Sequence, residues 1–328
     1  MFDMDQKIDF QAQENATKMI GYVKRAAEIT HTVIMADKKA SKAVSAIQTQ
    51  DKSRKWTVLQ EYLKEYPIFC VPLVVTSGTE SYRDNIDITV ETIYARQKNE
   101  NFKTSLPRPQ DIEDVYSAIA RQGYTHVIVL MIAECLSSAN NLMRLAAEEH
   151  PELTVKVFDS KSASIGLGAL AVQVARYAVR GVAFDPLCEL TKRLIDDTVV
   201  YFSLDTLEYL QRGGRIGRAT ALAGGLLQIK PILTFDRKDG MISTAAKVRG
   251  RRGVQQRLIE LATELAAKHP GEEYNLVVCD GNVPEEGAAL EAALTRALPN
   301  AHRVLHGKID ATLAVHLGPN LLGVGVQF

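Results

Sequence analysis

Three short turns rich in serine and threonine are the segments of this sequence best suited to hold an anion. They are Thr104-Ser105-Leu106-Pro107, Leu136-Ser137-Ser138 and Asp159-Ser160-Lys161-Ser162. Turns that follow strands gather at the carboxyl edge of an α/β sheet, where ligands bind. Amides at a helix start attract an anion, and a hydroxyl group can donate to it. Helix capping explains any one such turn, whereas three together favour an anion site as much as capping.

A glycine- and arginine-rich turn could contact an anion or a partner protein. Arg212, Arg215 and Arg218 recur there at three-residue spacing, and glycines separate them. The planar guanidinium fork suits carboxylate and phosphate groups, so we expect exposed contact residues. The alternatives are a flexible basic turn, or an internal ion pair of Arg215 with Asp205 or Glu208.

The catalytic motifs that spacing can reveal are absent from the sequence. No G-x-S-x-G, H-E-x-x-H, P-loop or G-x-G-x-x-G pattern occurs. His302 and His306 are four residues apart, which in an extended segment separates them by roughly 13 Å. That distance is too large for one metal ion. We therefore expect no metal site, and we interpret these histidines as ordinary core or surface residues.

Apolar periodicity predicts the strands and helices that must position these residues. Predicted strands cover 32–36, 69–75, 125–132, 154–158, 199–204, 275–279 and 323–328, and a hairpin surrounds 238–240. Predicted helices cover 9–29, 56–63, 111–122, 138–150, 165–180, 254–267 and 290–298, and another opens at 185–186. Pro72 lacks an amide donor, so its strand belongs at an edge or a bulge. Strands that alternate with helices imply an α/β fold.

The order of these elements predicts how the chain divides. We expect an N-terminal helical extension over 1–30, an α/β domain over 31–165 and a second α/β domain over 166–328. The extension is amphipathic, and self-association is a role that such a helix can serve.

Composition excludes several classes of protein. The 328 residues include 39 Lys+Arg and 39 Asp+Glu, so the net charge is zero, which argues against a nucleic-acid partner. The longest apolar run, 127–133, is too short to span a membrane, and the polar N-terminus is no secretory signal. Cys70, Cys135, Cys188 and Cys279 are far apart and are expected to be reduced, buried thiols, so we expect a cytoplasmic protein.

From about residue 32 onward, the sequence resembles the DegV family of bacterial fatty-acid-binding proteins, the lipid carriers of fatty acid kinase. Its motifs occur here in the family order. They stand as Val71-Pro72-Leu73, Tyr82-x-Asp84-x-x-Asp87-Ile88-Thr89, Thr104-Ser105-Leu106-Pro107, Leu136-Ser137-Ser138-Ala139, Asp159-Ser160 with Gly166-x-Gly168, Asp205-Thr206-Leu207-Glu208-Tyr209-Leu210, Arg212-Gly213-Gly214-Arg215-Ile216, Lys230-Pro231-Ile232-Leu233, Lys247-Val248-Arg249-Gly250 and His316-Leu317-Gly318-Pro319.

The resemblance implies two α/β domains with a long-chain fatty acid held between or within them. It implies that Thr104, Ser137 and His316 bind the carboxylate, with Ser105 beside them in the same motif. It also implies that Arg212 and Arg215 take part in the encounter with the kinase, which makes an acyl phosphate. No cofactor is implied beyond the fatty acid as ligand.

The head-group motifs depart from the family pattern at several positions. Leu106 and Arg108 replace the Gln and Ser of T-S-Q-P-S, Ser138-Ala139 replaces Gly-Thr, and Asp280 replaces a histidine that usually follows the late strand. Arg108, Ser138 and Asp280 are therefore candidates for residues that modify the site.

The leading hypothesis is a non-enzymatic carrier that presents the carboxylate of a fatty acid to a kinase. Two alternatives remain open at this point. One is an enzyme of the same fold that acts on another small anion. The other is a regulatory or scaffolding protein that has lost ligand binding.

Overall fold

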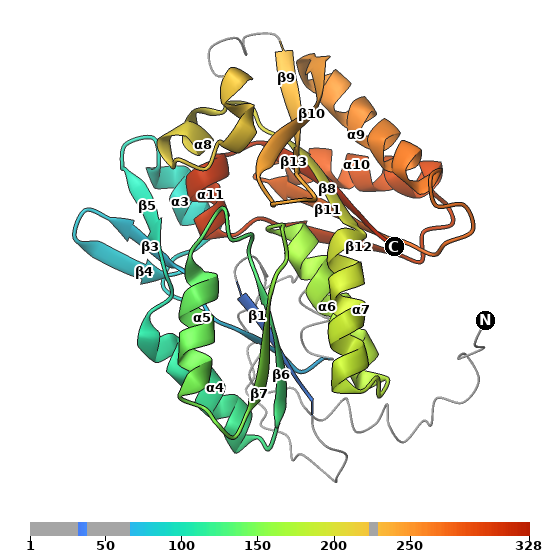
Figure 1. Cartoon of the computed structure of the whole chain (residues 1–328). Helices are drawn as coiled ribbons and strands as arrows, with labels where there is room; N and C mark the ends of the chain where they lie inside the picture. Colours follow the sequence, from blue (N-terminus) through green and yellow to red (C-terminus); the bar gives the residue numbers. More distant parts are fainter. Residues whose placement is uncertain (1–31, 38–65, 223–228) are drawn as a thin grey trace.

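The computed structural model describes residues 32–37, 66–222 and 229–328 (Figure 1). The helices predicted over 9–29 and 56–63 lie outside these residues, as does the N-terminal extension. Three sheets and the helices packed on them form a mixed α/β architecture, which confirms the predicted fold class. In Figure 1 the six-stranded sheet occupies the upper half of the molecule and the four-stranded sheet the lower half.

The four-stranded sheet has the order β2-β1-β6-β7. Its strands are β1 (Thr32–Asp37), β2 (Ile68–Cys70), β6 (His126–Met131) and β7 (Thr154–Asp159). Strand β6 runs parallel to β7 and antiparallel to β1. Its side chains alternate between two cores. Val127 and Val129 face helices α4 (Pro109–Arg121) and α5 (Ala139–Glu148), whereas Ile128 and Leu130 face the opposite layer. Burial on both faces explains why this strand is a continuous apolar run.

The six-stranded sheet has the order β10-β9-β8-β13-β11-β12, and only β11 and β12 are parallel neighbours. Its strands are β8 (Thr198–Ser203), β9 (Ile229–Phe235), β10 (Ile242–Arg249), β11 (Asn275–Gly281), β12 (Arg303–Lys308) and β13 (Leu321–Gln327). Helices α9 (Gly250–Ala266) and α10 (Pro284–Ala297) cover one face. Strands β9 and β10 form the hairpin that the sequence predicts around 238–240.

Helix α6 (Ile165–Val179) lies between the two large sheets and is buried almost all round. Ile165 and Ala169 pack into the core of the six-stranded sheet, while Leu167 and Leu170 pack against the four-stranded sheet. Helix α7 (Phe184–Asp196) lies beside it. The boundary predicted after residue 165 therefore falls at the start of a helix whose side chains pack into the cores of both large sheets.

A small three-stranded sheet, order β4-β3-β5, completes the fold. It contains β3 (Val74–Ser77), β4 (Glu80–Arg83) and β5 (Phe102–Ser105), and it packs with α3 (Val90–Arg96) and α11 (Ala311–Leu317). The single strand predicted over 69–75 is wrong. The chain leaves the four-stranded sheet after β2 and enters the small sheet as β3, and Pro72 lies in the break, where no ladder amide is required.

The predictions for the cysteines hold in part. All four thiols are free, but Cys135 is exposed in the turn after β6 and is not a core residue. None of the described helices is both long and apolar enough to span a bilayer.

Candidate functional site

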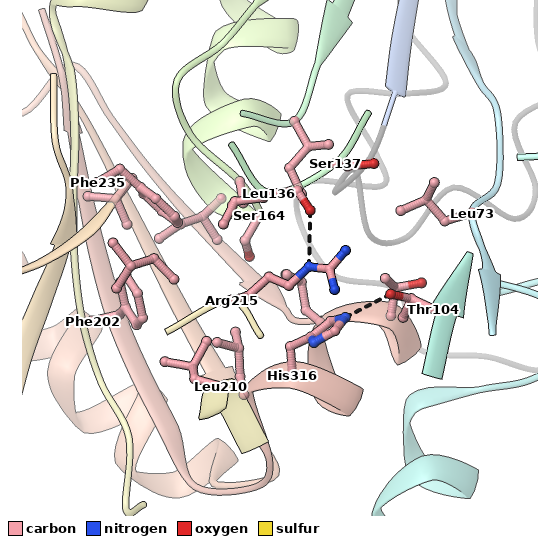
Figure 2. Close-up of a pocket in the computed structure, with 18 of the residues that line it drawn as sticks. Leu73, Thr104, Leu136, Ser137, Ser164, Phe202, Leu210, Arg215, Phe235 and His316 are labelled. Carbon is pink, nitrogen blue, oxygen red and sulfur yellow. Dashed lines mark hydrogen bonds between the residues drawn. The ribbon is translucent and has the colours of Figure 1, made fainter. Parts of the chain in front are cut away.

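A pocket of about 240 Å³ opens where the three sheets approach one another (Figure 2). Most of its wall is apolar. Its lining consists of Leu73, Thr104, Ser105, Leu106, Ile132, Leu136, Ser137, Ser138, Ala163, Ser164, Ile165, Val200, Phe202, Leu210, Arg215, Phe235, Ile242, Cys279, Thr312, Leu313, His316, Leu317 and Leu321. Four residues of the predicted head-group site, namely Thr104, Ser105, Ser137 and His316, are therefore brought to one cavity.

The polar side of the pocket is built around a contact between Thr104 and His316. Thr104 Oγ1 lies 2.7 Å from His316 Nε2, although 212 residues separate the two in sequence. Thr104 is held on β5 by its pairing with Val75 of β3, and His316 projects from the last turn of α11. When Nε2–H donates to Thr104 Oγ1, the Thr104 hydroxyl keeps its own proton free to donate to a bound anion.

Helix α11 is fixed at its N-terminus by two buried carboxylates. Asp310 is the N-cap and accepts a hydrogen bond from the amide of Leu313 at 2.6 Å. Asp84, which follows β4, accepts from the amides of Ala311 and Thr312 at 3.2 and 3.0 Å. These bonds join the small sheet to the helix that carries His316, so they set where the imidazole lies.

A glycine of the arginine-rich turn sets the position of the His316 ring from the other side. A Cβ atom on Gly213 would lie 2.1 Å from His316 Nδ1. The turn follows α8 (Glu208–Arg212) and leads into the short helix η1 (Gly217–Leu222). Only a residue without a side chain leaves room for the imidazole at this place.

Ser137 lines the pocket and satisfies the first amide of α5, whose N-cap residue is Ser138. The Ser137 Oγ accepts a hydrogen bond from the amide of Ala139 at 3.3 Å. Asn140 joins the start of α5 to the end of the preceding strand, because its buried side-chain amide donates to the carbonyl of Ile132 at 3.1 Å. Exposed Ser138 also lines the pocket. The capping and binding interpretations of this turn are therefore compatible, because a hydroxyl that accepts one hydrogen bond can still donate another.

Arg215 points into the pocket and does not lie on the open surface. Its Nε donates to the carbonyl of Leu136 at 3.2 Å, and its Nη1 donates to the carbonyl of Gly213 at 2.7 Å. The expectation of an exposed side chain holds for Arg218 and for Arg212, whose guanidinium lies 5.0 Å from the centre of the Tyr209 ring, but not for Arg215.

The alternative of an internal ion pair for Arg215 is also not found. Asp205 instead lies near Lys230 and Arg251, at 3.3 and 3.8 Å. No salt bridge of Glu208 to Arg215 occurs among the residues that the structure describes.

Two of the candidate site-modifying residues do not line the pocket. Arg108 is exposed, and its guanidinium donates to the carbonyl of Ser81 at 3.2 Å. Asp280 is buried on β11, where it accepts from the amide of Val283 and lies 3.3 Å from His306 Nε2. Only Ser138 of the three is at the site. Departures from the family motifs suggested Arg108 and Asp280. The side chain of Arg108 instead contacts Ser81, and that of Asp280 contacts His306.

The third hydroxyl-rich turn contributes a residue that sequence reasoning missed. Ser160 and Ser162 are buried, and the Ser160 hydroxyl donates to the carbonyl of Ser162 and accepts from its amide. Ser164, two residues further on, lines the pocket with an unusual backbone conformation of φ 54° and ψ −130°. Its hydroxyl makes no hydrogen bond to any described residue, and neither does the buried hydroxyl of Thr312. The clustering of serines was a signal for this turn, but the positive φ that aims Ser164 depends on the tertiary packing.

The apolar side of the pocket comes mainly from the six-stranded sheet. Phe202 and Phe235 lie on neighbouring strands with ring centres 5.4 Å apart, and Ile242 and Ile165 extend the same wall. Cys279 is the thiol at this wall. Complete burial raises the pKa of the Cys279 thiol far above its usual range, so it stays protonated and is a poor nucleophile at neutral pH.

The charge of the pocket is one-sided. Arg215 and His316 are its ionisable nitrogen groups, and no Asp or Glu is among the described residues that line it. Nor do the described ranges contain a group of three or more His, Cys, Asp or Glu side chains that could hold a metal ion. Donors at one side and an aromatic and aliphatic wall at the other suit an amphiphile with an anionic head.

Known proteins match this chain over most of its length. The family model described as "Uncharacterised protein, DegV family" matches residues 56–328. A DegV domain-containing protein of Clostridium acetobutylicum is 32% identical over 266 residues, which are 81% of this chain and 93% of the relative.

Solved structures of similar proteins share the fold. A fatty-acid-binding DegV family protein from Thermus thermophilus superposes with a TM-score of 0.72 at 30% identity, over 78% of this chain and 90% of that one. A stearic-acid-binding protein from Eubacterium ventriosum superposes with a TM-score of 0.75 at 28% identity, over 81% and 93% of the two chains. The match of the family model to most of the sequence, together with these likenesses, shows that the chain belongs to the DegV family.

Proposed function

We propose that this chain binds a long-chain fatty acid in the pocket, with the carboxylate at Thr104, Ser137 and His316. The observation that carries the proposal is the pairing of an apolar pocket with hydrogen-bond donors that gather at one side of it, without a carboxylate among the described lining residues. The description of the Thermus thermophilus and Eubacterium ventriosum relatives as fatty-acid-binding proteins supports it.

The hydrophobic term of such binding is large. Burial of about 14 methylene groups at about 0.8 kcal/mol each contributes on the order of 11 kcal/mol before the costs of ordering the chain. The wall of Phe202, Phe235 and Ile242 is where the acyl chain would lie. A carboxylate that enters the same cavity loses hydration, so fixed donors must replace the lost water. Two hydroxyl groups and an imidazole meet that need.

The proposed role is a carrier that is not itself an enzyme. Hydroxyls, an imidazole and a guanidinium hold an anion, and the thiol of Cys279 is held protonated by burial. We infer that the chain presents the carboxylate to a fatty acid kinase in the cytoplasm, which makes the acyl phosphate. Exposed Ser105 and Leu106 lie at the pocket mouth, and exposed Arg212 is the side chain we assign to the kinase contact. The two α/β domains, divided near residue 165, would then hold the lipid between them.

Lipid extraction tests the binding step. Organic solvent should release about one equivalent of fatty acid from freshly purified protein, and the delipidated protein should take up one equivalent of oleate or palmitate. Mass spectrometry identifies and counts the released lipid. A protein that carries no fatty acid and also ignores added oleate and palmitate would contradict the proposal.

A coupled assay tests the carrier step. With ATP and a fatty acid kinase, the oleate-loaded protein should support formation of acyl phosphate, and the Arg212→Ala variant should support it at least tenfold less well with unchanged oleate affinity. Full turnover by that variant would remove Arg212 from the kinase contact.

A further inference from the structure

Two hydroxyl groups of the pocket lack a hydrogen-bond partner. They belong to Thr312, in the first turn of α11, and to Ser164, at the N-cap position of α6. Both oxygens are shielded from solvent, and neither bonds to any residue that the structure describes. Thr312 as a whole is only 3% exposed, so bulk water does not replace the missing bond. A buried hydroxyl without a partner costs free energy, because it gave up its bonds to water on folding.

The two hydroxyls lie apart from the contacts proposed for the carboxylate. Thr312 and His316 are four residues apart in α11, so they share one face of the helix and lie about 6 Å apart along its axis. In Figure 2, Ser164 lies between Phe235 and the Thr104–His316 pair. The part of the pocket that would hold the acyl chain therefore contains polar atoms that a plain hydrocarbon leaves unpaired.

The backbone at Ser164 adds to the cost of this arrangement. Its φ of 54° and ψ of −130° are a conformation that residues other than glycine rarely adopt. Strain of this kind destabilises the free protein and gathers at binding sites. Neither the strained serine nor the unpaired hydroxyls strengthen the fold, and such features are typical of groups that serve a bound ligand.

We propose that Thr312 and Ser164 bind a second polar group of the ligand, so that the pocket prefers fatty acids whose chain carries a hydroxyl group over the plain acid of the same length. The inference rests on the proposed fatty-acid site and specifies the class of fatty acid that this site takes. A hydroxyl group on the chain can donate to one of these side chains and accept from the other. In a wholly apolar pocket it would lose its hydration without compensation, so such a pocket disfavours hydroxy acids.

A titration series tests the preference on the wild-type protein. Delipidated protein is titrated with palmitate and with hydroxypalmitates that differ only in the position of the hydroxyl group along the chain. We expect the best of the hydroxypalmitates to bind about two- to tenfold more tightly than palmitate, the range for one neutral hydrogen bond. The position that binds best then gives the distance of the second polar contact from the carboxylate.

The Thr312→Val variant tests the assignment of the contact, because valine keeps the shape of the side chain and removes the hydroxyl. It should bind the preferred hydroxypalmitate about tenfold less tightly and palmitate within about twofold of the wild type. Its Tm without lipid should not fall, because the lost hydroxyl has no partner among the described residues. Ser164→Ala, which keeps a side chain at the strained position, should change the two affinities in the same directions.

Thr191→Val is the matched control. Thr191 is buried in α7 and does not line the pocket, and its hydroxyl donates to the carbonyl of Leu187 at 2.7 Å. This variant should leave both affinities unchanged.

The outcomes separate this inference from the proposed function. Palmitate that binds at least as tightly as every hydroxypalmitate would overturn the inference and leave the fatty-acid site standing, and that result needs no variant to fold. Thr312→Val and Ser164→Ala variants that both keep the wild-type preference would overturn it as well. A wild-type protein that binds none of these acids would overturn the proposed function and this inference together.

Discussion

Replacement of Asp84 by asparagine should disturb the lipid site from a distance. Asp84 is 4% exposed and does not line the pocket. Both of its carboxylate oxygens accept amides at the start of α11, from Ala311 at 3.2 Å and from Thr312 at 3.0 Å. Asparagine has nearly the same shape but only one acceptor oxygen. Its NH₂ group would face an amide donor, so one of the two hydrogen bonds at the N-terminus of α11 is lost. The other hydrogen bond is kept, but its acceptor is a neutral amide oxygen and no longer a carboxylate.

The size of the effect follows from these two bonds. A hydrogen bond to a charged group is worth about 1.5–3 kcal/mol and a neutral one about 1 kcal/mol, so loss of one and weakening of the other costs roughly 2–4 kcal/mol. At about 2 °C per kcal/mol for a chain of this size, Tm should fall by roughly 4–8 °C. Oleate affinity should also fall, because α11 carries His316.

Thermal unfolding of the delipidated protein, followed by oleate titration well below Tm, measures both effects. Asp87→Asn is the matched control. Asp87 belongs to the same segment but pairs with Arg83 at the surface, where an ion pair contributes at most about 1 kcal/mol. It should shift Tm by no more than about 2 °C and leave affinity unchanged. An Asp84→Asn protein with wild-type Tm and affinity would refute the reasoning that Asp84 positions α11.

Three further changes probe other contacts. Gly213→Ala should weaken oleate binding, measured by titration, because the new Cβ would lie 2.1 Å from His316 Nδ1; an unchanged affinity would show that the ring moves freely. Ser137→Ala should reduce oleate affinity about ten- to a hundredfold with the fold retained by circular dichroism, and no loss would place the head group elsewhere. The hydrogen bond to Asp280 raises the pKa of His306, so its stabilisation is complete below about pH 6.5 and is lost as pH rises through the folded-state value. Tm should therefore fall from pH 6 to pH 9 by more in the wild type than in His306→Gln, and identical pH profiles would contradict this.

Local patterns were enough to predict the main layers of the fold. The run of apolar residues at Val127–Met131 specifies a strand buried on both faces, and α4, α5, α6 and α9 were found within a few residues of their bounds. Pro72 marked an irregular point, but only tertiary pairing shows that the chain changes sheets there. Helix α11 was missed because its seven residues are nearly all buried, which removes the amphipathic pattern.

The site was predictable in its parts and not in its arrangement. Hydroxyl-rich turns and the family resemblance pointed to Thr104, Ser137 and His316, and the structure places all three at one pocket. Arg215 was expected at the surface because glycines and arginines are typical of exposed turns. Its side chain points into the pocket, where it donates to the carbonyl of Leu136, a residue 79 positions away in sequence. Asp280 was expected near the pocket, but the register of β11 turns it toward His306.

The position of the carboxylate in a crystal structure of the chain with oleate tests the central claim most directly. We expect its oxygens within hydrogen-bond distance, about 3 Å, of Thr104 Oγ1 and Ser137 Oγ, beside the His316 ring that contacts Thr104, with the acyl chain against Phe202 and Phe235. Oleate with its head at the aromatic wall, or bound outside this pocket, would contradict the proposed site.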